Sequence, residues 1–382
     1  MSTALKYSVG LDCSKDDFQA CISLIDDAQY VKVKASRKFA NTKRGFEEAN
    51  YWTRKHCKEK IPVVVVMEAT GNYYENLALF FHQESYRVSV VLPNKAKKYM
   101  ESHGIKTKND PVDAKGLSQM GAEQRLREWE PYSKDIYQLR LLTRQCERLV
   151  AYKTQLKNQL HSLVFGMYQN EIVEGQIDEM LQVVDCQIDE AKKQIEAFIA
   201  ADEKLSKKVE KILPIKGVAI QTIAAIIAET NGFKLIENQK QLTSYAGYDV
   251  VENQSGKRVG KTRISKKGNS HIRRAMFFPA INVVTFKETQ FVNLYERVYE
   301  RTKIKMKGYV AVQRKLLCLI YTLWKKDEVY DPNFGQTSGN NEPKPLFQLS
   351  EEKTNKKVAP TSEGATLDGL PCKKSPEALF QL

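Results

Sequence analysis

The pattern of apolar and polar positions divides the chain into an alternating strand and helix part and a long helical part. From residue 5 to about 125, short apolar runs bounded by turn residues alternate with stretches of helical spacing. Such alternation is typical of a mixed α/β domain. The expected strands are 7–12, 18–25, 31–37, 63–67 and 87–92, and the expected helices are 42–58 and 73–84.

Residues 136–212 have a different pattern, with apolar side chains repeating every three or four positions. This spacing predicts two long antiparallel helices separated by a break at 168–175. A hairpin of this kind often pairs with its copy in another chain, so we expect a coiled-coil spacer and a homo-oligomer, either a dimer or a tetramer. An ordinary intramolecular bundle is the alternative.

The C-terminal part is predicted to be mostly α-helical up to Asp331, and the chain beyond it is rich in Pro, Gly, Ser, Asn and Lys, which predicts disorder. An apolar helix at 220–228 follows the turn Ile215-Lys216-Gly217-Val218-Ala219. This turn resembles a helix-hairpin-helix turn that holds a DNA phosphate, or else it leads into a plain core helix. The predicted domains are 1–127, 128–212, 213–331 and 332–382.

The composition and charge of the chain limit the classes of partner that it can bind. The 382 residues have a formal charge of +14, which favours an anionic partner, either nucleic acid or a membrane surface. A membrane is the weaker choice because no apolar run approaches 18 residues and no secretory signal is present. The seven cysteines include no CxxC pair, which indicates reduced thiols and argues against structural zinc. We therefore expect a cytoplasmic, nucleoid-associated bacterial protein.

Four acidic residues stand where such a fold can bring them together. Asp12 and Glu68 each end an apolar strand, and Asp110 and Asp113 lie about one helical turn apart. Converging carboxylates bind hard divalent ions such as Mg²⁺, and two such ions about 3.5 to 4 Å apart support phosphodiester cleavage. Three strands, a helix and further strand and helix units are the order of a ribonuclease H-like (RuvC-like) domain, although the pattern alone leaves other topologies open.

Each acid also has a structural explanation. Asp12 can end a strand at a turn, Glu68 can be a surface residue, and Asp110 before Pro111 can be a helix N-cap. Asp113 can be a first-turn acid favoured by the helix dipole. The combination favours a metal site because the apolar strand 63–67 is expected to be buried, where a terminal carboxylate needs a partner.

Two basic stretches are candidate phosphate-binding segments. The first is an expected loop between Leu92 and Asp110, and the second runs from Lys257 to Arg274 without one acid, with Ser255 at its head. A solvated charged surface is the alternative for both. Beside such cations a serine alkoxide and a pentacoordinate phosphorus would be stabilised, although a serine beside glycine is usually a turn residue. The candidate nucleic-acid-binding residues are Lys106, Lys108, Lys257, Arg258, Lys261, Arg263, Lys266, Lys267, Arg273 and Arg274.

These blocks together resemble an insertion-sequence transposase family that has an N-terminal RuvC-like DEDD domain, a coiled-coil spacer and a C-terminal domain with a catalytic serine. The family includes a pilin-gene DNA invertase and recombinases guided by a bridge RNA. The resemblance rests on Gly10 to Lys15, Met67 to Gly71, Asp110 to Ala114, the spacer start at 140–163, and Gly247 to Ala275.

The resemblance implies that Asp12, Glu68, Asp110 and Asp113 bind Mg²⁺ and that Ser255 attacks a DNA phosphate. It implies DNA as substrate and a guide RNA as a further partner. Val250 stands where the family often has proline, and Ala219 stands where its turn usually has glycine, so the local loop geometry differs.

The leading hypothesis is a DNA strand-transfer enzyme, either a transposase or an invertase, in which the four acids and Ser255 build one composite site. The second is a metal-dependent nuclease of the Holliday-junction resolvase kind, which hydrolyses with water and needs no serine. The third is a non-catalytic protein that binds nucleic acid through its basic surface.

Overall fold

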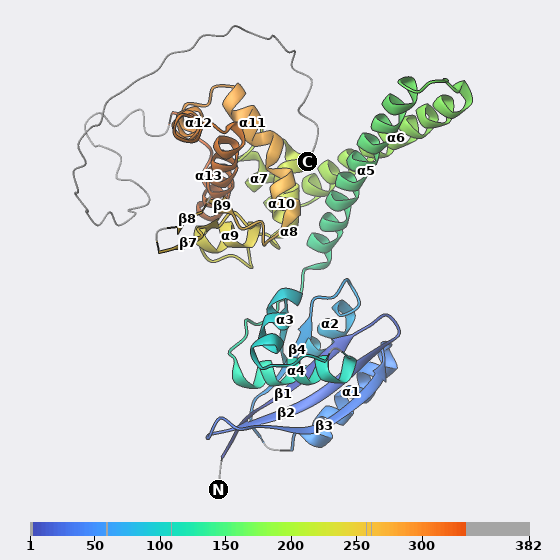
Figure 1. The fold of residues 1–382 in the computed structure, drawn as a ribbon, viewed down its shortest axis with the longest axis vertical. Helices are drawn as coiled ribbons and strands as arrows, with labels where there is room; N and C mark the ends of the chain where they lie inside the picture. The colour runs from blue at the N-terminus through green and yellow to red at the C-terminus, as the bar shows by residue number, and fades with distance from the viewer. Residues whose placement is uncertain (1–2, 59, 108, 257, 261, 334–382) are drawn as a thin grey trace, which may run out of the picture. The chain divides into compact units, whose positions relative to one another are not determined.

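A five-stranded sheet organises the N-terminal part, in the order β3-β2-β1-β4-β5 (Figure 1). Its strands are β1 (Ala4–Cys13), β2 (Asp17–Asp26), β3 (Val31–Ala40), β4 (Val63–Glu68) and β5 (Arg87–Val91). The first three pair antiparallel, and β4 and β5 are added parallel to β1 and to each other. The predicted mixed α/β domain is confirmed. The computed structural model describes residues 3–58, 60–107, 109–256, 258–260 and 262–333.

Helices cover both faces of this sheet because alternate strand residues point to opposite sides. Tyr7, Val9 and Leu11 of β1 are buried in one apolar cluster with side chains of the first two helices. Ser8 and Gly10 point to the other face, under the fourth helix. The four helices are α1 (Lys43–His56) and α2 (Glu75–Gln83) on the first face and α3 (Pro93–Ser102) and α4 (Asp110–Glu123) on the second.

The prediction of a basic loop between Leu92 and Asp110 is wrong for most of this segment, because Pro93 to Ser102 form helix α3. Pro93 occupies the first turn, where its missing N–H is not needed. Ala96 and Tyr99 are buried against the sheet domain, while the lysines lie on the exposed side of the helix. The run of lysines favoured a loop in the sequence, although these residues form an amphipathic helix.

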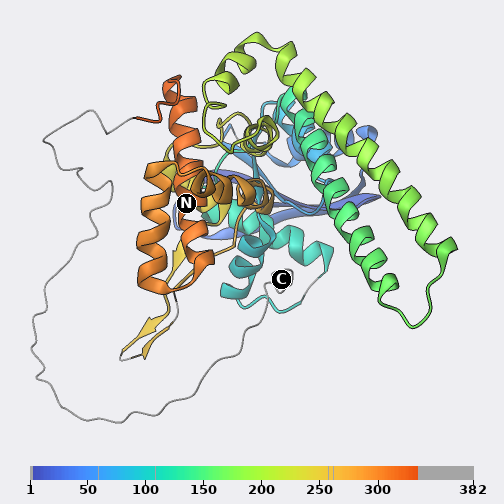
Figure 2. The ribbon, with the colours of Figure 1, turned by 90° about the horizontal axis from the view of Figure 1, so that it is seen from above.

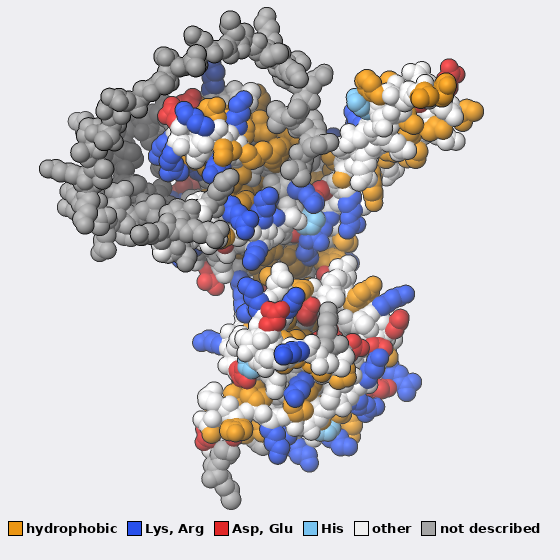
Figure 3. Space-filling view, viewed as in Figure 1, with side chains coloured by type: hydrophobic (Ala, Val, Ile, Leu, Met, Phe, Trp, Pro, Cys, Tyr) orange, Lys and Arg blue, Asp and Glu red, His pale blue; other side chains and the backbone are white. Residues whose placement is uncertain are grey.

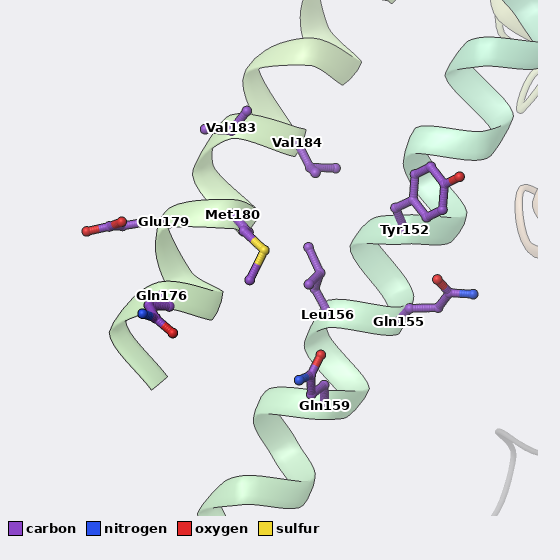
Figure 4. A pocket seen from close by; sticks show the side chains of 9 residues that line it. All are labelled: Tyr152, Gln155, Leu156, Gln159, Gln176, Glu179, Met180, Val183 and Val184. Atoms are coloured by element: carbon purple, nitrogen blue, oxygen red, sulfur yellow. The ribbon is translucent and has the colours of Figure 1, made fainter. Parts of the chain in front are cut away.

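Two long helices, α5 (Lys134–Val164) and α6 (Glu171–Ala201), form the predicted hairpin. The break falls at 165–170, earlier than expected, because Asn170 caps α6 by accepting hydrogen bonds from Ile172 N and Val173 N. Toward the connection the helices separate around an open groove of about 730 Å³. In Figure 4 Leu156, Met180 and Val184 point into it, whereas Glu179 points away.

The C-terminal part is mostly helical, as expected, and one apolar core holds it together. Leu139 of α5 and Ile195 of α6 are buried in the same cluster as Ile226 and Leu316. The core is therefore continuous across residue 212, and residues 1–332 form one compact unit. The helices are α7 (Glu203–Glu210), α8 (Ile220–Glu229), α9 (Gln239–Ala246), α10 (Ser270–Ala275), α11 (Phe277–Thr285), α12 (Thr289–Thr302) and α13 (Lys305–Lys326).

A narrow β-hairpin interrupts these helices between α9 and α10. Its base pairs β6 (Val250–Val251) with β9 (Arg263–Ile264), and its outer part pairs β7 (Gln254–Ser255) with β8 (Arg258–Val259). In Figure 2 it projects from the surrounding helices as two yellow strands. Within the described residues, every helix is too short or too polar to span a lipid bilayer. The predicted domain boundaries stay predictions, and residues 334–382 of the predicted tail lie outside the described residues.

Candidate active site

Asp12 and Glu68 stand on neighbouring strands at the same end of the sheet. The strands β1 and β4 are parallel, and Leu11 pairs with Met67, so the next residue on each strand is an acid. Neighbouring strands lie about 4.8 Å apart. The carboxyl ends of β1 and β4 therefore present two acids side by side.

Two glycines fix how α4 lies on this sheet. A Cβ atom at Gly10 would stand 2.2 Å from both the Ala114 carbonyl oxygen and the Ser118 nitrogen, so the helix backbone rests directly on β1. A Cβ atom at Gly121 would stand 2.3 Å from Ser8 Oγ. Helix α4 therefore runs antiparallel to β1: Ser8 lies near the C-terminal end of α4, and Gly10 lies nearer its N-terminus. That N-terminus lies at the end of β1 that carries Asp12.

Asp110 and Asp113 occupy the first turn of α4. Asn109, not Asp110, is the N-cap, and its side chain accepts a hydrogen bond from Val112 N at 3.0 Å. The capping explanation for Asp110 is thus wrong, which leaves its carboxylate for another role. Asp12 is two residues from Gly10 and so shares its face of the sheet, under α4. The backbone brings all four acids to one end of one face.

Basic and polar side chains border this end. Lys38 Nζ lies 2.7 Å from Asp17 Oδ2, and this hydrogen bond raises the pKa of Lys38. Burial opposes the rise, and the charges of Asp17 and Asp110 add to it. Thr70 Oγ1 donates to Glu68 Oε1 at 3.2 Å. Burial, helped by the charge of Asp12, raises the pKa of the Cys13 thiol to about 12.

The chemistry of these donors fits Mg²⁺, because four carboxylates supply the hard oxygen ligands that this ion takes. Among the residues that the structure describes, no three Asp, Glu, His or Cys side chains form a metal-binding group. The structure therefore places the backbone of the predicted site. Metal binding by Asp12, Glu68, Asp110 and Asp113 stays a prediction.

Ser255 ends β7 at the outer turn of the hairpin. It pairs with Arg258 across a two-residue turn, and Gly256 takes the left-handed conformation there, with φ of 55°. Such a turn needs positive φ, which glycine adopts without strain. A Cβ atom at Gly256 would meet no other atom within 4 Å, so the turn is open. Ser255 thus directly precedes an open turn; its side chain lies outside the described residues, and its nucleophilic role stays a prediction.

The predicted phosphate-binding residues divide into two groups. Arg263, Lys266 and Lys267 are exposed, as is Lys106 near the sheet domain. Arg273 instead points into the fold, where its guanidinium donates to the carbonyl oxygens of Ala246, Gly268 and Asn269. Lys108, Lys257 and Lys261 lie outside the described residues, as does the side chain of Arg258.

Arg274 and His271 both contact Glu147 of α5. Arg274 forms an ion pair with Glu147 Oε1, and His271 Nδ1 lies 2.6 Å from Glu147 Oε2. The histidine nearest to Ser255 in the sequence is therefore engaged with Glu147.

The turn before α8 is packed against α11: a Cβ atom at Gly217 would stand 2.5 Å from Asn282 Cβ, and Ile223 of α8 is fully buried. The plain-core alternative for that helix is confirmed.

Sequence reasoning missed a buried carboxylate, Glu229, at the end of α8. Its two oxygens accept from Arg144 Nε at 2.6 Å and Arg144 Nη2 at 3.0 Å, and Asn269 Nδ2 donates to it at 2.6 Å. Burial raises its pKa, but the hydrogen bonds from Arg144 and Asn269 and the charges of Arg140 and Arg144 outweigh burial and hold the pKa below its usual value. No local motif marks Glu229, because its partners come from distant segments.

The sheet order defines the class as a mixed α/β domain joined to a mostly helical domain that carries a basic hairpin. Two family models match the chain, a DEDD "Transposase" model at residues 9–169 and the model "Transposase IS116/IS110/IS902 family" at residues 209–296. The chain belongs to the IS110 transposase family and is a DNA transposase or recombinase.

Known proteins similar to the chain include invertases and transposases. A pilin gene-inverting protein of Moraxella bovis is 27% identical over 85% of this chain and 98% of its own length. The transposase for insertion sequence element IS1111A of Coxiella burnetii is 22% identical over 84% of this chain and 90% of its own length. Thermus thermophilus RuvC aligns with 32% of this chain and 99% of its own at 10% identity, with a TM-score of 0.26.

Proposed function

We propose that this transposase cuts and rejoins DNA through a covalent link between Ser255 and a DNA phosphate, with Asp12, Glu68, Asp110 and Asp113 as ligands of Mg²⁺. The observation that carries the proposal is the contact of α4 with Gly10, because it brings acids from three distant parts of the sequence to one end of the sheet. Like charges gathered in this way repel one another unless a cation lies between them.

The four acids hold the cation, and the α4 N-terminus favours the negative charges of Asp110 and Asp113. When bound, Mg²⁺ polarises the phosphate and stabilises the departing oxygen. Ser255 attacks the phosphorus: the Oγ–P bond forms, one P–O bond of the DNA breaks, the serine proton leaves, and the departing DNA oxygen gains a proton. Reversal of the same step by another DNA hydroxyl rejoins the strand, so no nucleotide cofactor is needed.

The partners that we propose are DNA, a guide RNA and further copies of the chain. The basic residues 263–267 supply phosphate contacts for either nucleic acid. The groove between α5 and α6 supports coiled-coil pairing with a second copy, because Met180 and Val183 are 46% and 63% exposed there. Sequencing of RNA that co-purifies with the protein tests the guide.

DNA inversion is a second candidate for the biological outcome. The pilin gene-inverting protein of Moraxella bovis aligns over 98% of its length, so the likeness includes both the sheet domain and the hairpin region. Inversion and transposition use the same cleavage and rejoining chemistry and differ in the sites that are joined.

The test is a denaturing gel that detects protein bound covalently to a DNA substrate carrying the recombination site. We expect the parent protein and Mg²⁺ to give a covalent product that protease digestion removes. Ser255→Ala should abolish this product while DNA binding and oligomeric state are retained, since loss of one hydroxyl in an open turn costs little stability. Ser255→Cys should retain some product because a thiolate is also a nucleophile.

Asp110→Asn is the matched test of the acidic site. It removes one charge next to an unchanged Asn109 cap, so we expect cleavage to be lost and folding to be kept. Free nicks without covalent product would instead identify a nuclease that uses water. DNA that is shifted on the gel but not cut would identify a binding protein. If the Asp110→Asn protein cleaves DNA at the rate of the parent, Asp110 has only a structural role.

A further inference from the structure

The corner where α12 meets α13 carries a second concentration of positive charge. From Arg301 to Lys307 the sequence has four Lys or Arg residues and no Asp or Glu. Arg301, Lys303, Lys305 and Lys307 are exposed around the turn, and none of the four is ion-paired with any acid that the structure describes. In Figure 3 Lys and Arg side chains gather over α12, with a smaller acidic group beside them.

This corner is held rigidly. A Cβ atom at Gly308 would stand 2.6 Å from Tyr295 Cδ2, so glycine lets the Tyr295 ring pack directly on the α13 backbone. The same ring lies 4.7 Å from the Tyr309 ring and 6.0 Å from the Tyr299 ring, centroid to centroid. The cations are therefore presented by a fixed pair of helices.

Two lysines stand where local stability does not favour them. Lys303 ends α12 with φ of 54°, a left-handed conformation that glycine normally supplies. Lys305 lies in the first turn of α13, where the helix dipole favours an acid. Residues that break local rules in this way cluster at functional sites.

The features of the α13 start suit a phosphate group. No side chain caps this helix and no acid lies in its first turn, so no capping side chain satisfies its first backbone N–H groups. The nearby acids Glu296 and Glu300 lie on α12, before the turn.

We propose that the α12–α13 corner binds the phosphate backbone of a nucleic acid, independently of sequence and separately from the Ser255 hairpin. The proposal rests on the proposed function only for the class of partner. DNA and RNA share the backbone chemistry, and the experiment distinguishes them.

The experiment compares two double variants in full-length Ser255→Ala protein, where no cleavage interferes. Lys305→Gln with Lys307→Gln alters the corner, and Lys325→Gln with Lys326→Gln removes the same charge from the other end of α13. Affinities for a random-sequence DNA duplex and for a hairpin RNA are measured by fluorescence anisotropy over a range of KCl concentrations. Thermal unfolding checks that both variants fold.

We expect the corner variant to reduce the slope of log affinity against log salt by roughly two, because each phosphate contact contributes about 0.9. The control should leave the slope nearly unchanged. A reduction with one nucleic acid alone identifies that partner. Equal slopes in the corner variant and parent, or equal losses in both variants, overturn the proposal. A parent that binds neither nucleic acid would overturn the proposed function as well, which separates the two failures.

Discussion

At the scale of single residues, Gly10 decides whether the acidic site exists. Gly10→Ala would put a methyl group 2.2 Å from two backbone atoms of α4, which cannot rotate away as a side chain can. We expect a loss of about 3 kcal/mol in unfolding free energy, at the upper end of overpacking effects. We also expect strand cleavage to be lost, because α4 carries Asp110 and Asp113.

Gly175→Ala is the matched control for this substitution. Gly175 lies inside α6, and a Cβ atom there would meet nothing within 4 Å. Alanine should therefore stabilise the helix by roughly 0.5–1 kcal/mol. Urea unfolding and the cleavage gel check both variants; parental cleavage by a folded Gly10→Ala protein would show that the position of α4 does not matter.

The sequence predicted the positions of Asp12 and Glu68 in the fold better than the local role of Asp110. Asp12 and Glu68 were expected at strand ends, and β1 and β4 place them there. The structural alternative for Asp110 was the cap of α4, which in the structure belongs to Asn109. Adjacent Asn and Asp offer the same hydrogen bond, so the first turn could not be fixed to one residue without the backbone.

At the scale of elements, Glu229 joins α8 to α5 and to the segment before α10. Glu229→Gln should lower the free energy of unfolding by about 2 kcal/mol at neutral pH, because it leaves Arg144 without its carboxylate. This loss of unfolding free energy is below the usual range for a buried ion pair because the Arg144 side chain is 27% exposed.

This stabilisation should depend on pH in one direction. The pKa of Glu229 is lower in the folded state than its ordinary value of 4.5, so the stabilisation is complete above that value and is lost as the pH falls through the folded pKa. The stability difference between parent and Glu229→Gln should therefore shrink on acidification. Urea titrations across this range check it, with exposed Asp178→Asn as control; a constant difference would contradict it.

Elements were predicted where a repeat was clear and missed where two signals competed. The sheet strands and the α5–α6 hairpin follow from apolar periodicity. Helix α3 was missed because three lysines around Ala96 outweighed its short apolar side. The Glu229 cluster was missed for a different reason: a buried ion pair joins segments far apart in the sequence, and no local pattern records that contact.

At the scale of the whole molecule, the open groove of the hairpin predicts self-association. Val183→Glu should weaken the oligomer at least tenfold, because a charge would be buried in an apolar contact at a cost above about 1.4 kcal/mol. Sedimentation equilibrium measures the change. Gln187→Glu, which adds the same charge to an exposed position of α6 outside the groove, should have little effect. Equal effects would place the contact elsewhere.

The two edges of the N-terminal sheet affect whether copies of the protein aggregate at high concentration. Edge strand β3 exposes Lys32, Lys34 and Lys38, whose charges oppose the approach of another strand. At the opposite edge the chain protects itself, since Trp129 N donates to Val88 O of β5 at 2.7 Å. Both features oppose edge-to-edge aggregation of copies of the chain at high concentration.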